Sequence, residues 1–247
     1  MAAGLPGPQL SPPRGAAGSL VLLHGAGGRG QLWQHQLLAF PQAVAPDLPG
    51  RAGDAPRTTV AELAAWIGAY LDARAPDRIV LGGHSLGAAV ALQVALDAPA
   101  RLRGLILVGA GARLRVRPEF FELLRADPRS GVEEFLRWWF SPAASPRVVA
   151  RARAALRDVP AAVLEADLRA ADGFDVRARL AEIALPTLIL CGEEDRLTPL
   201  EYSEYLRAHL SAAQLVVVPR AGHLVMLEQP RLVNEAIGGF LRRLEDG

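Results

Sequence analysis

A serine stands at the centre of the glycine-flanked sequence Gly-His-Ser-Leu-Gly at 83–87. A short apolar run with branched residues, 79–81, precedes it, and an Ala- and Leu-rich stretch with strong helix propensity follows it. This pattern predicts that Ser85 lies on a tight turn between a strand and a helix, where glycine neighbours avoid collisions between Cβ atoms. The free N–H groups and the positive end of the helix would then face negative charge that develops beside Ser85.

A serine hydroxyl is a weak nucleophile at neutral pH, so it needs a nearby base and a third group that orients the base. His223 is the best candidate for the base, because it follows an apolar strand run at 215–218 and should emerge at the same edge of a sheet as Ser85. Asp195 is the best candidate for the orienting acid, because it too comes shortly after a strand run. Four other carboxylates stay open as alternatives: Asp172, Asp175, Glu193 and Glu194.

The other histidines are weaker candidates for proton transfer. His24 lies in a glycine turn, which we expect it to shape, and His84 belongs to the serine turn itself. His35 and His209 lie in predicted helices and are interpreted as surface residues. A metal site built from 193–195 is disfavoured, because three consecutive side chains rarely converge on one ion and no histidine is close in sequence.

The elements that must position these residues alternate along the chain. Short apolar runs predict strands, and helical patterns separate most of them. Strands alternating with helices imply a mostly parallel sheet with helices on both faces, whose functional sites lie at the carboxyl ends of the strands. The strands are expected at 19–23, 43–46, 79–81, 105–108, 187–190 and 215–218.

Helix-start signals recur between the strands. Capping boxes are expected at Thr59 with Glu62 and at Ser130 with Glu133. Residues that combine a cap with a first-turn proline, or a proline alone, predict further helix starts. These lie at 145–146, at 160, at 198–199 and at 230.

The pattern changes between 113 and 183, where strand runs disappear and helical signals succeed one another. We therefore predict an α/β core at 19–111 and 184–247, a helical cap at 112–183 inserted after the strand at 105–108, and an irregular N-terminal arm at 1–18. Much of the aromatic surface of the chain falls in the cap, where it would suit an apolar pocket.

The composition narrows the classes of function. The chain of 247 residues is 51% hydrophobic and has a formal net charge of +1, which argues against a nucleic-acid partner. Cys191 is the only cysteine, so neither an intrachain disulfide nor a thiolate metal cluster is possible. No apolar run approaches the ~20 residues that span a bilayer, and the start lacks a signal-peptide pattern. We expect a cytoplasmic protein without a membrane partner, either a monomer or a small homo-oligomer.

Four motifs, each after a predicted strand and in this order, make the chain resemble an α/β-hydrolase from about Gly18 onward. They are the stretches 24–28 (His-Gly-Ala-Gly-Gly), 83–87, 192–195 (Gly-Glu-Glu-Asp) and 222–223 (Gly-His). One departure is that the Pro-rich start leaves little room for the antiparallel strand pair that usually comes first, so the sheet is expected to be trimmed at that edge.

The resemblance implies a role for each site residue. Ser85 would be the nucleophile, His223 the base and then the acid, and Asp195 the orienting group. The backbone N–H groups of Leu86 and Ala26 would form the oxyanion hole, with Gly27 as the alternative second donor. Residues expected to contact substrate are Gly25, Trp138, Trp139, Phe140 and Leu224.

This reading predicts a serine carboxylesterase that acts on small to medium acyl chains through an acyl-enzyme. No cofactor and no metal is expected, and the substrate would be a small-molecule ester. A serine at this position disfavours epoxide hydrolases and dehalogenases, which use aspartate. Alternatives that stay open are hydrolysis of carbon–carbon bonds, thioesters or lactones, acyl transfer, perhydrolysis, and a ligand-binding protein without catalysis.

Overall fold

The computed structural model describes residues 19–74 and 78–246 of the chain. The expected N-terminal arm at 1–18 lies outside the described residues. Six strands form one sheet in the order β2-β1-β3-β4-β5-β6, and every pairing is parallel. Their bounds are β1 Leu20–Leu23, β2 Ala43–Val44, β3 Ile79–His84, β4 Leu102–Val108, β5 Thr187–Gly192 and β6 Ala213–Val218.

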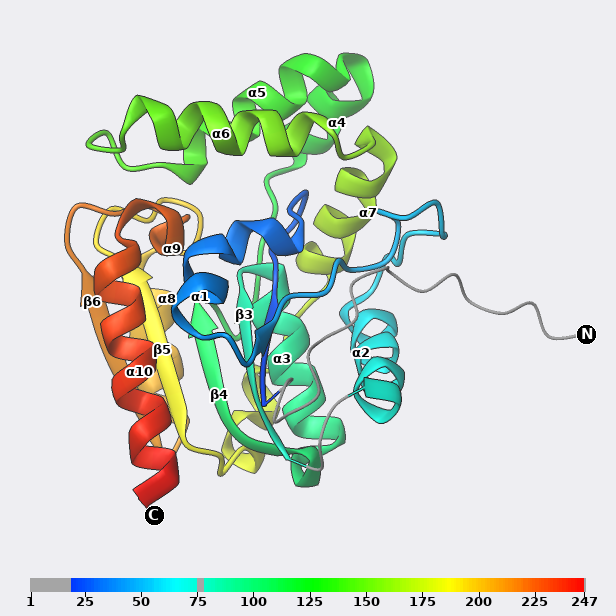
Figure 1. Ribbon diagram of the computed structural model, residues 1–247. Helices are drawn as coiled ribbons and strands as arrows, with labels where there is room; N and C mark the ends of the chain where they lie inside the picture. Colours follow the sequence, from blue (N-terminus) through cyan, green and yellow to red (C-terminus); the bar gives the residue numbers. More distant parts are fainter. Residues whose placement is uncertain (1–18, 75–77, 247) are drawn as a thin grey trace, which may run out of the picture.

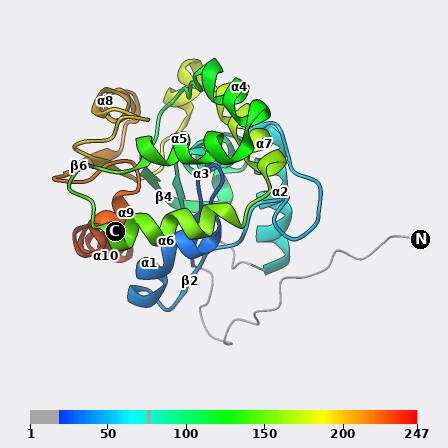
Figure 2. The same ribbon diagram turned by 90° about the horizontal axis from the view of Figure 1, so that it is seen from above.

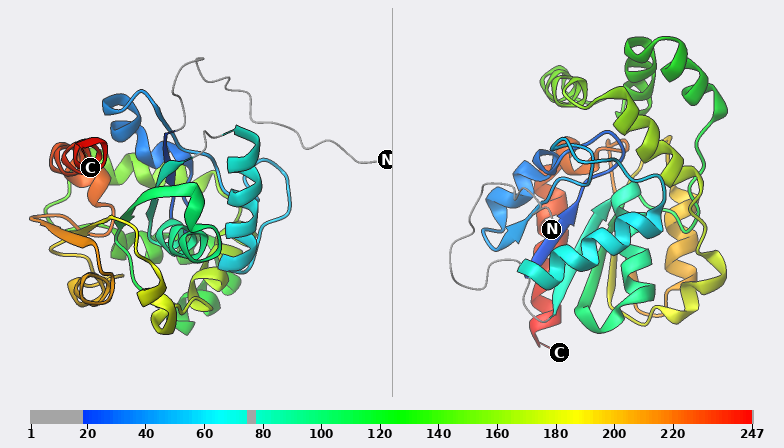
Figure 3. Two further views of the ribbon diagram at one scale, coloured as in Figure 1. Left: turned by 90° about the horizontal axis from the view of Figure 1, so that it is seen from below. Right: turned by 90° about the vertical axis from the view of Figure 1, so that its right-hand side faces the viewer.

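Helices cover both faces of this sheet (Figure 3). Helices α2, α3 and α8 lie on one face, whereas α1 and α10 lie on the other. The strands between them are almost wholly buried in β1, β3 and β5, which explains why they read as continuous apolar runs. These helices are α1 Gln34–Ala39, α2 Val60–Arg74, α3 Leu86–Asp97, α8 Leu200–His209 and α10 Pro230–Asp246. The predicted α/β architecture is thereby confirmed.

Four helices between β4 and β5 lie above the carboxyl ends of the strands (Figures 1 and 2). We call them the α4–α7 layer. They are α4 Pro118–Ala126, α5 Pro128–Trp139, α6 Pro146–Arg157 and α7 Ala161–Asp172. The short elements that complete the described chain are η1 Gly30–Trp33, η2 Pro99–Arg101, η3 Arg177–Glu182 and α9 Val225–Glu228. Because all six strands point the same way, the loops that follow their carboxyl ends lie on the side of the sheet that this layer covers.

Local signals at the helix starts are partly confirmed. At α2, the Glu62 N–H donates to Thr59 Oγ1 at 3.2 Å and the Thr59 N–H donates to Glu62 Oε2 at 3.1 Å, which is the predicted capping box. The box expected at Ser130 is wrong, because α5 begins two residues earlier. The Asp127 carboxylate caps α5 by accepting the Arg129 N–H at 3.1 Å, and the following proline occupies the first turn.

Candidate active site

The serine turn has the strained geometry that the sequence predicts. Ser85 joins β3 to α3 with φ 53° and ψ −115°, in the left-handed region that residues with a side chain rarely adopt. Its N–H donates to the Val108 carbonyl at 2.9 Å, which ties the turn to the neighbouring strand. A Cβ at Gly83 would collide with the backbone of Gly87, and a Cβ at Gly87 would collide with the Leu23 carbonyl. The glycines therefore permit the turn and the close approach of α3 to β1.

His223 and Asp195 meet at the carboxyl ends of β6 and β5. The distance between His223 Nδ1 and Asp195 Oδ2 is 2.8 Å, and the two side chains are 2% and 0% exposed. Asp195 Oδ1 accepts the N–H groups of Leu197 and Thr198, each at 2.9 Å, and the Thr198 hydroxyl donates to Oδ2 at 2.8 Å. The structure thus brings Asp195 and His223 together, as the sequence analysis expected, and the role of Asp195 as the orienting acid stays a prediction. Thr198, which was expected to cap α8, instead donates to Asp195, and α8 begins after Pro199.

The carboxylate of Asp195 determines which nitrogen of the His223 ring carries a proton. Burial alone would raise the pKa of Asp195, but the adjacent His223 ring and the hydrogen bonds from Thr198 outweigh burial and lower that pKa. An ionised Asp195 accepts a proton-bearing Nδ1, so Nε2 is the nitrogen of His223 that is available as a base. Three of the four alternative acids are engaged elsewhere: Asp172 accepts the Val116 N–H, Asp175 pairs with Arg177, and Glu193 accepts the Arg220 N–H.

A second histidine, His84, contacts the backbone of His223. His84 Nε2 lies 2.9 Å from the His223 carbonyl oxygen, and the two rings are 4.5 Å apart. A carbonyl only accepts, so His84 carries its proton on Nε2. Burial and the nearby His223 lower the pKa of His84 well below its usual value, which keeps the ring neutral. Because His84 directly precedes Ser85, this contact joins the serine turn to the histidine loop, which the sequence analysis did not anticipate.

The glycine loop, residues 24–28, follows β1 and lies beside the serine turn. His24 shapes it as expected: its Nε2 accepts the Leu48 N–H at 2.9 Å, and its Nδ1 donates to the Gly25 carbonyl at 2.9 Å. The Gly28 N–H also donates to Gly25, and Gly27 sits at φ +67°. Burial lowers the pKa of His24 well below its usual value, so this ring is uncharged.

The two candidate second donors of the oxyanion hole differ in this loop. The Gly27 N–H donates to Asp167 Oδ2 of α7 at 2.8 Å. That N–H is occupied by a carboxylate of the α4–α7 layer, so it is not free for a substrate oxygen. The geometry favours Ala26 over Gly27 as the partner of Leu86 in binding an oxyanion.

The expected substrate contacts divide between two places. Trp139 and Phe140 are buried, and the Trp139 carbonyl accepts the Leu224 N–H at 3.1 Å, directly after His223. Trp138 instead packs against two guanidinium groups, those of Arg117 at 5.4 Å and Arg196 at 5.3 Å from its ring centre. It lines a small depression of about 80 Å³ together with Arg117, Glu119, Phe120, Leu123 and Glu134.

Glu228 links the α4–α7 layer to the loop that carries His223. Its Oε1 accepts the Gly222 N–H at 3.0 Å and its Oε2 accepts the Ser141 N–H at 2.9 Å. Burial raises the pKa of this carboxyl to about 7, with the charge of Asp195 contributing in the same direction. No local pattern predicts this contact, because its partners come from separate parts of the chain.

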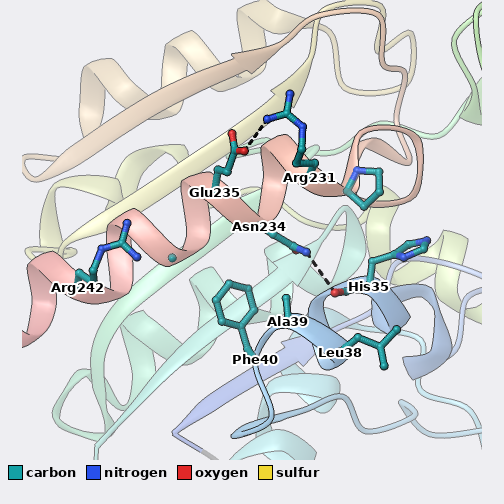
Figure 4. Close-up of a pocket in the computed structure, with 10 residues that line it drawn as sticks. His35, Leu38, Ala39, Phe40, Arg231, Asn234, Glu235 and Arg242 are labelled. Carbon is teal, nitrogen blue, oxygen red and sulfur yellow. Dashed lines mark hydrogen bonds and ion pairs between the residues drawn. The ribbon is translucent and has the colours of Figure 1, made fainter.

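A larger depression, about 660 Å³ in volume, lies between α1 and α10 (Figure 4). In it the Asn234 amide donates to the His35 carbonyl at 3.2 Å and Arg231 pairs with Glu235 at 2.6 Å. None of Ser85, Asp195 and His223 lines it.

Within residues 19–74 and 78–246, no group of three or more His, Cys, Asp or Glu side chains is arranged to hold a metal ion. No helix in this part of the chain is long and apolar enough to cross a membrane.

Comparisons with known proteins agree on one group. Residues 20–236 match the model of the alpha/beta hydrolase family. A protein of Variovorax paradoxus, provisionally named a carbamate hydrolase, is 34% identical, with 93% of this chain and 94% of the relative covered. The pimeloyl-[acyl-carrier protein] methyl ester esterase of Edwardsiella ictaluri is also 34% identical, with 90% and 92% covered. The solved structure of a thermophilic esterase superposes with a TM-score of 0.81 at 35% identity, with 92% and 90% covered.

Proposed function

Because the chain belongs to the alpha/beta hydrolase family, we propose that it is a serine hydrolase that cleaves carboxylic esters of small to medium acyl chains. The observation that carries the proposal is the 2.8 Å contact between His223 and Asp195 beside a serine held at φ 53°. Esterases among the relatives support a small-molecule ester as the substrate class. No cofactor enters the proposed reaction.

The proposed reaction proceeds through an acyl-enzyme. Ser85 Oγ attacks the ester carbonyl while His223 Nε2 takes its proton, and Asp195 stabilises the imidazolium that forms. The N–H groups of Leu86 and Ala26 bind the oxyanion of the tetrahedral intermediate. His223 then gives the proton to the leaving alcohol. A water molecule that transfers a proton to His223 attacks the acyl-enzyme, and the acid leaves as Ser85 regains its proton.

We propose that residues 112–183 act as a cap over this site. Apolar side chains of the α4–α7 layer reach the glycine loop: a Cβ at Gly27 would lie only 2.9 Å from Leu164 Cδ1 and would also meet Leu156. Such close apolar packing beside the serine turn would suit short or medium acyl groups. The proposed lining of the substrate site on the side of His223 consists of Gly25, Trp139, Phe140 and Leu224. Trp138 is proposed to contact substrate at the outer edge of the site.

The test is hydrolysis of p-nitrophenyl esters from acetate to palmitate by the wild type and by Ser85→Ala. We expect turnover that is highest with short or medium chains and is lost in Ser85→Ala. Turnover that survives in Ser85→Ala would reject Ser85 as the nucleophile, and no turnover with any ester would reject the esterase proposal.

Carbamate hydrolysis is a second candidate, because one 34% identical relative carries that name. A p-nitrophenyl carbamate belongs in the same panel as the esters. Faster release from the carbamate than from every ester would favour this second function, and slower release would favour the first.

A further inference from the structure

A buried ion pair lies outside the proposed triad and joins the α4–α7 layer to the core. Arg51 follows β2 and Asp167 lies on α7, and their side chains are 0% and 2% exposed. The guanidinium binds both carboxylate oxygens, through Nη1 at 3.3 Å to Oδ1 and through Nη2 in a shorter contact to Oδ2. Burial of two charges costs several kcal/mol per ion unless further hydrogen bonds satisfy them, so the other partners of the pair matter.

Those further partners lie in the glycine loop. Asp167 Oδ2 accepts the Gly27 N–H at 2.8 Å, and Arg51 Nε donates to the Gly28 carbonyl at 3.0 Å. The pair therefore binds one donor and one acceptor of two consecutive residues. Arg51 Nη1 also donates to the Pro49 carbonyl at 2.9 Å, which anchors the guanidinium to its own loop.

The glycine loop needs such an anchor. Three of its five residues are glycines, which have more backbone freedom than any other residue, and Gly27 is in the left-handed region at φ +67°. Inside the loop, the Gly28 N–H donates to the Gly25 carbonyl and so closes a four-residue turn around Ala26 and Gly27. The peptide between Ala26 and Gly27, which carries the Ala26 carbonyl and the Gly27 N–H, can rotate in a turn of this kind, and Asp167 accepts that N–H in one orientation only. The contact thus holds the chain on the carboxyl side of Ala26, and the turn hydrogen bond from Gly28 to Gly25 spans the residue on both sides.

We propose that Arg51 and Asp167 are positioning residues that hold the glycine loop so that the Ala26 N–H points at the oxyanion. This inference rests on the proposed serine hydrolase function. Because Asp167 belongs to α7, the oxyanion hole is complete only while the α4–α7 layer is docked on the core. The pair thus couples the position of this layer to the stabilisation of the transition state, without itself contacting the substrate.

The test uses Asp167→Asn, the double variant Arg51→Met/Asp167→Leu, and a matched control, Glu165→Gln. Glu165 lies on the same helix and pairs with Arg125 and Arg169 at the surface. Full loss of one oxyanion donor lowers kcat about 100- to 1000-fold, so a loosened loop should lower kcat about 10- to 100-fold. KM should change less than about three-fold, because binding of the ground state does not use this donor.

A trifluoromethyl ketone separates a positioning role from a structural one. Its adduct with Ser85 carries an oxyanion, so its affinity should fall in proportion to kcat/KM in both Asp167 variants, whereas inhibition by the carboxylic acid product should persist. Hydrogen exchange of the peptide that contains Gly27 should accelerate in Asp167→Asn. Glu165→Gln should match the wild type in every readout.

Two results would overturn the inference: wild-type kcat and ketone affinity in both Asp167 variants, or parallel loss of ketone and product binding with a lowered melting temperature. Unchanged exchange at Gly27 in Asp167→Asn would overturn it independently of any activity. A wild type that hydrolyses no ester and does not bind the ketone would instead reject the proposed function, while the exchange measurement would still decide whether the pair holds the loop.

Discussion

Replacing Gly109 with alanine tests the geometry of the acid–base pair directly. Gly109 follows β4 at φ +53°, and its N–H donates to the Leu190 carbonyl at 2.9 Å. A Cβ added there would lie 3.0 Å from His223 Nδ1 and 3.3 Å from Asp195 Oδ2. The new methyl group would therefore press on the two atoms whose separation, 2.8 Å, defines the pair.

Two effects of this substitution add and can be separated. An alanine in the left-handed region costs about 1–2 kcal/mol of stability, which lowers Tm by roughly 2–8 °C in a chain of this size. Independently, His223 must shift to relieve the contact, and because a misplacement of ~1 Å can cost about 100-fold in rate, a smaller shift should lower kcat/KM about 10- to 100-fold.

The matched control is Gly53→Ala. Gly53 also has a positive φ, +87°, but a Cβ there would meet no atom within 4 Å. This variant should show a similar fall in Tm with wild-type kcat/KM, measured by thermal unfolding and by steady-state ester hydrolysis. Full activity in Gly109→Ala, or an equal loss of activity in Gly53→Ala and Gly109→Ala, would show that a methyl group at position 109 does not act by displacing His223.

Three further substitutions probe the groups around His223. Asp195→Asn should lower kcat about 10⁴-fold, because an amide no longer stabilises the imidazolium; a loss below about 10-fold would exclude Asp195 as the orienting acid. Thr198→Val removes one of the four hydrogen bonds to that carboxylate. Urea unfolding should therefore show a loss of stability of about 1.5–3 kcal/mol, and ester hydrolysis should show a smaller fall in kcat than in Asp195→Asn. Wild-type values in both assays would contradict this. The pKa of Glu228 is raised to about 7 from the usual 4.5. Between these two pH values the folded state therefore binds more protons than the unfolded state. This group thus lowers the free energy of unfolding as pH rises from about 4.5 to 7. Urea unfolding of Glu228→Gln should lack that part of the pH dependence, and an unchanged difference between pH 5 and pH 8 would show that the carboxyl is not perturbed.

Sequence reasoning succeeded where local chemistry fixes the backbone. The tight turn at Ser85 was predictable because glycines stand at the positions where a turn between strand and helix admits no Cβ. The pairing of His223 with Asp195 was predictable because the carboxyl ends of parallel strands meet at one edge of the sheet. Both inferences use rules that act over a few residues or over the whole sheet.

The parts that were missed depend on contacts between distant segments. Asp167 meets Arg51 across 116 positions and His84 meets the His223 backbone across 139 positions, and neither separation leaves a pattern in the sequence. Thr198 was misread because its spacing fits a helix cap, whereas α8 begins at Leu200 with Pro199 at the cap position, and the Thr198 hydroxyl donates to the Asp195 carboxylate. Ser130 was misread for a similar reason, since an aspartate followed by proline begins the helix earlier.

The proposed mechanism requires that Ser85 carries the acyl group of the substrate during turnover. The direct measurement is acid quenching of the wild-type enzyme during hydrolysis of p-nitrophenyl acetate, followed by peptide mass analysis of the quenched protein. We predict one acetyl group on the peptide that contains Ser85 in the wild type, and no acetyl group on that peptide in Ser85→Ala. Steady turnover by the wild type with acetylation of a different residue, or with the same labelling in Ser85→Ala, would contradict the account.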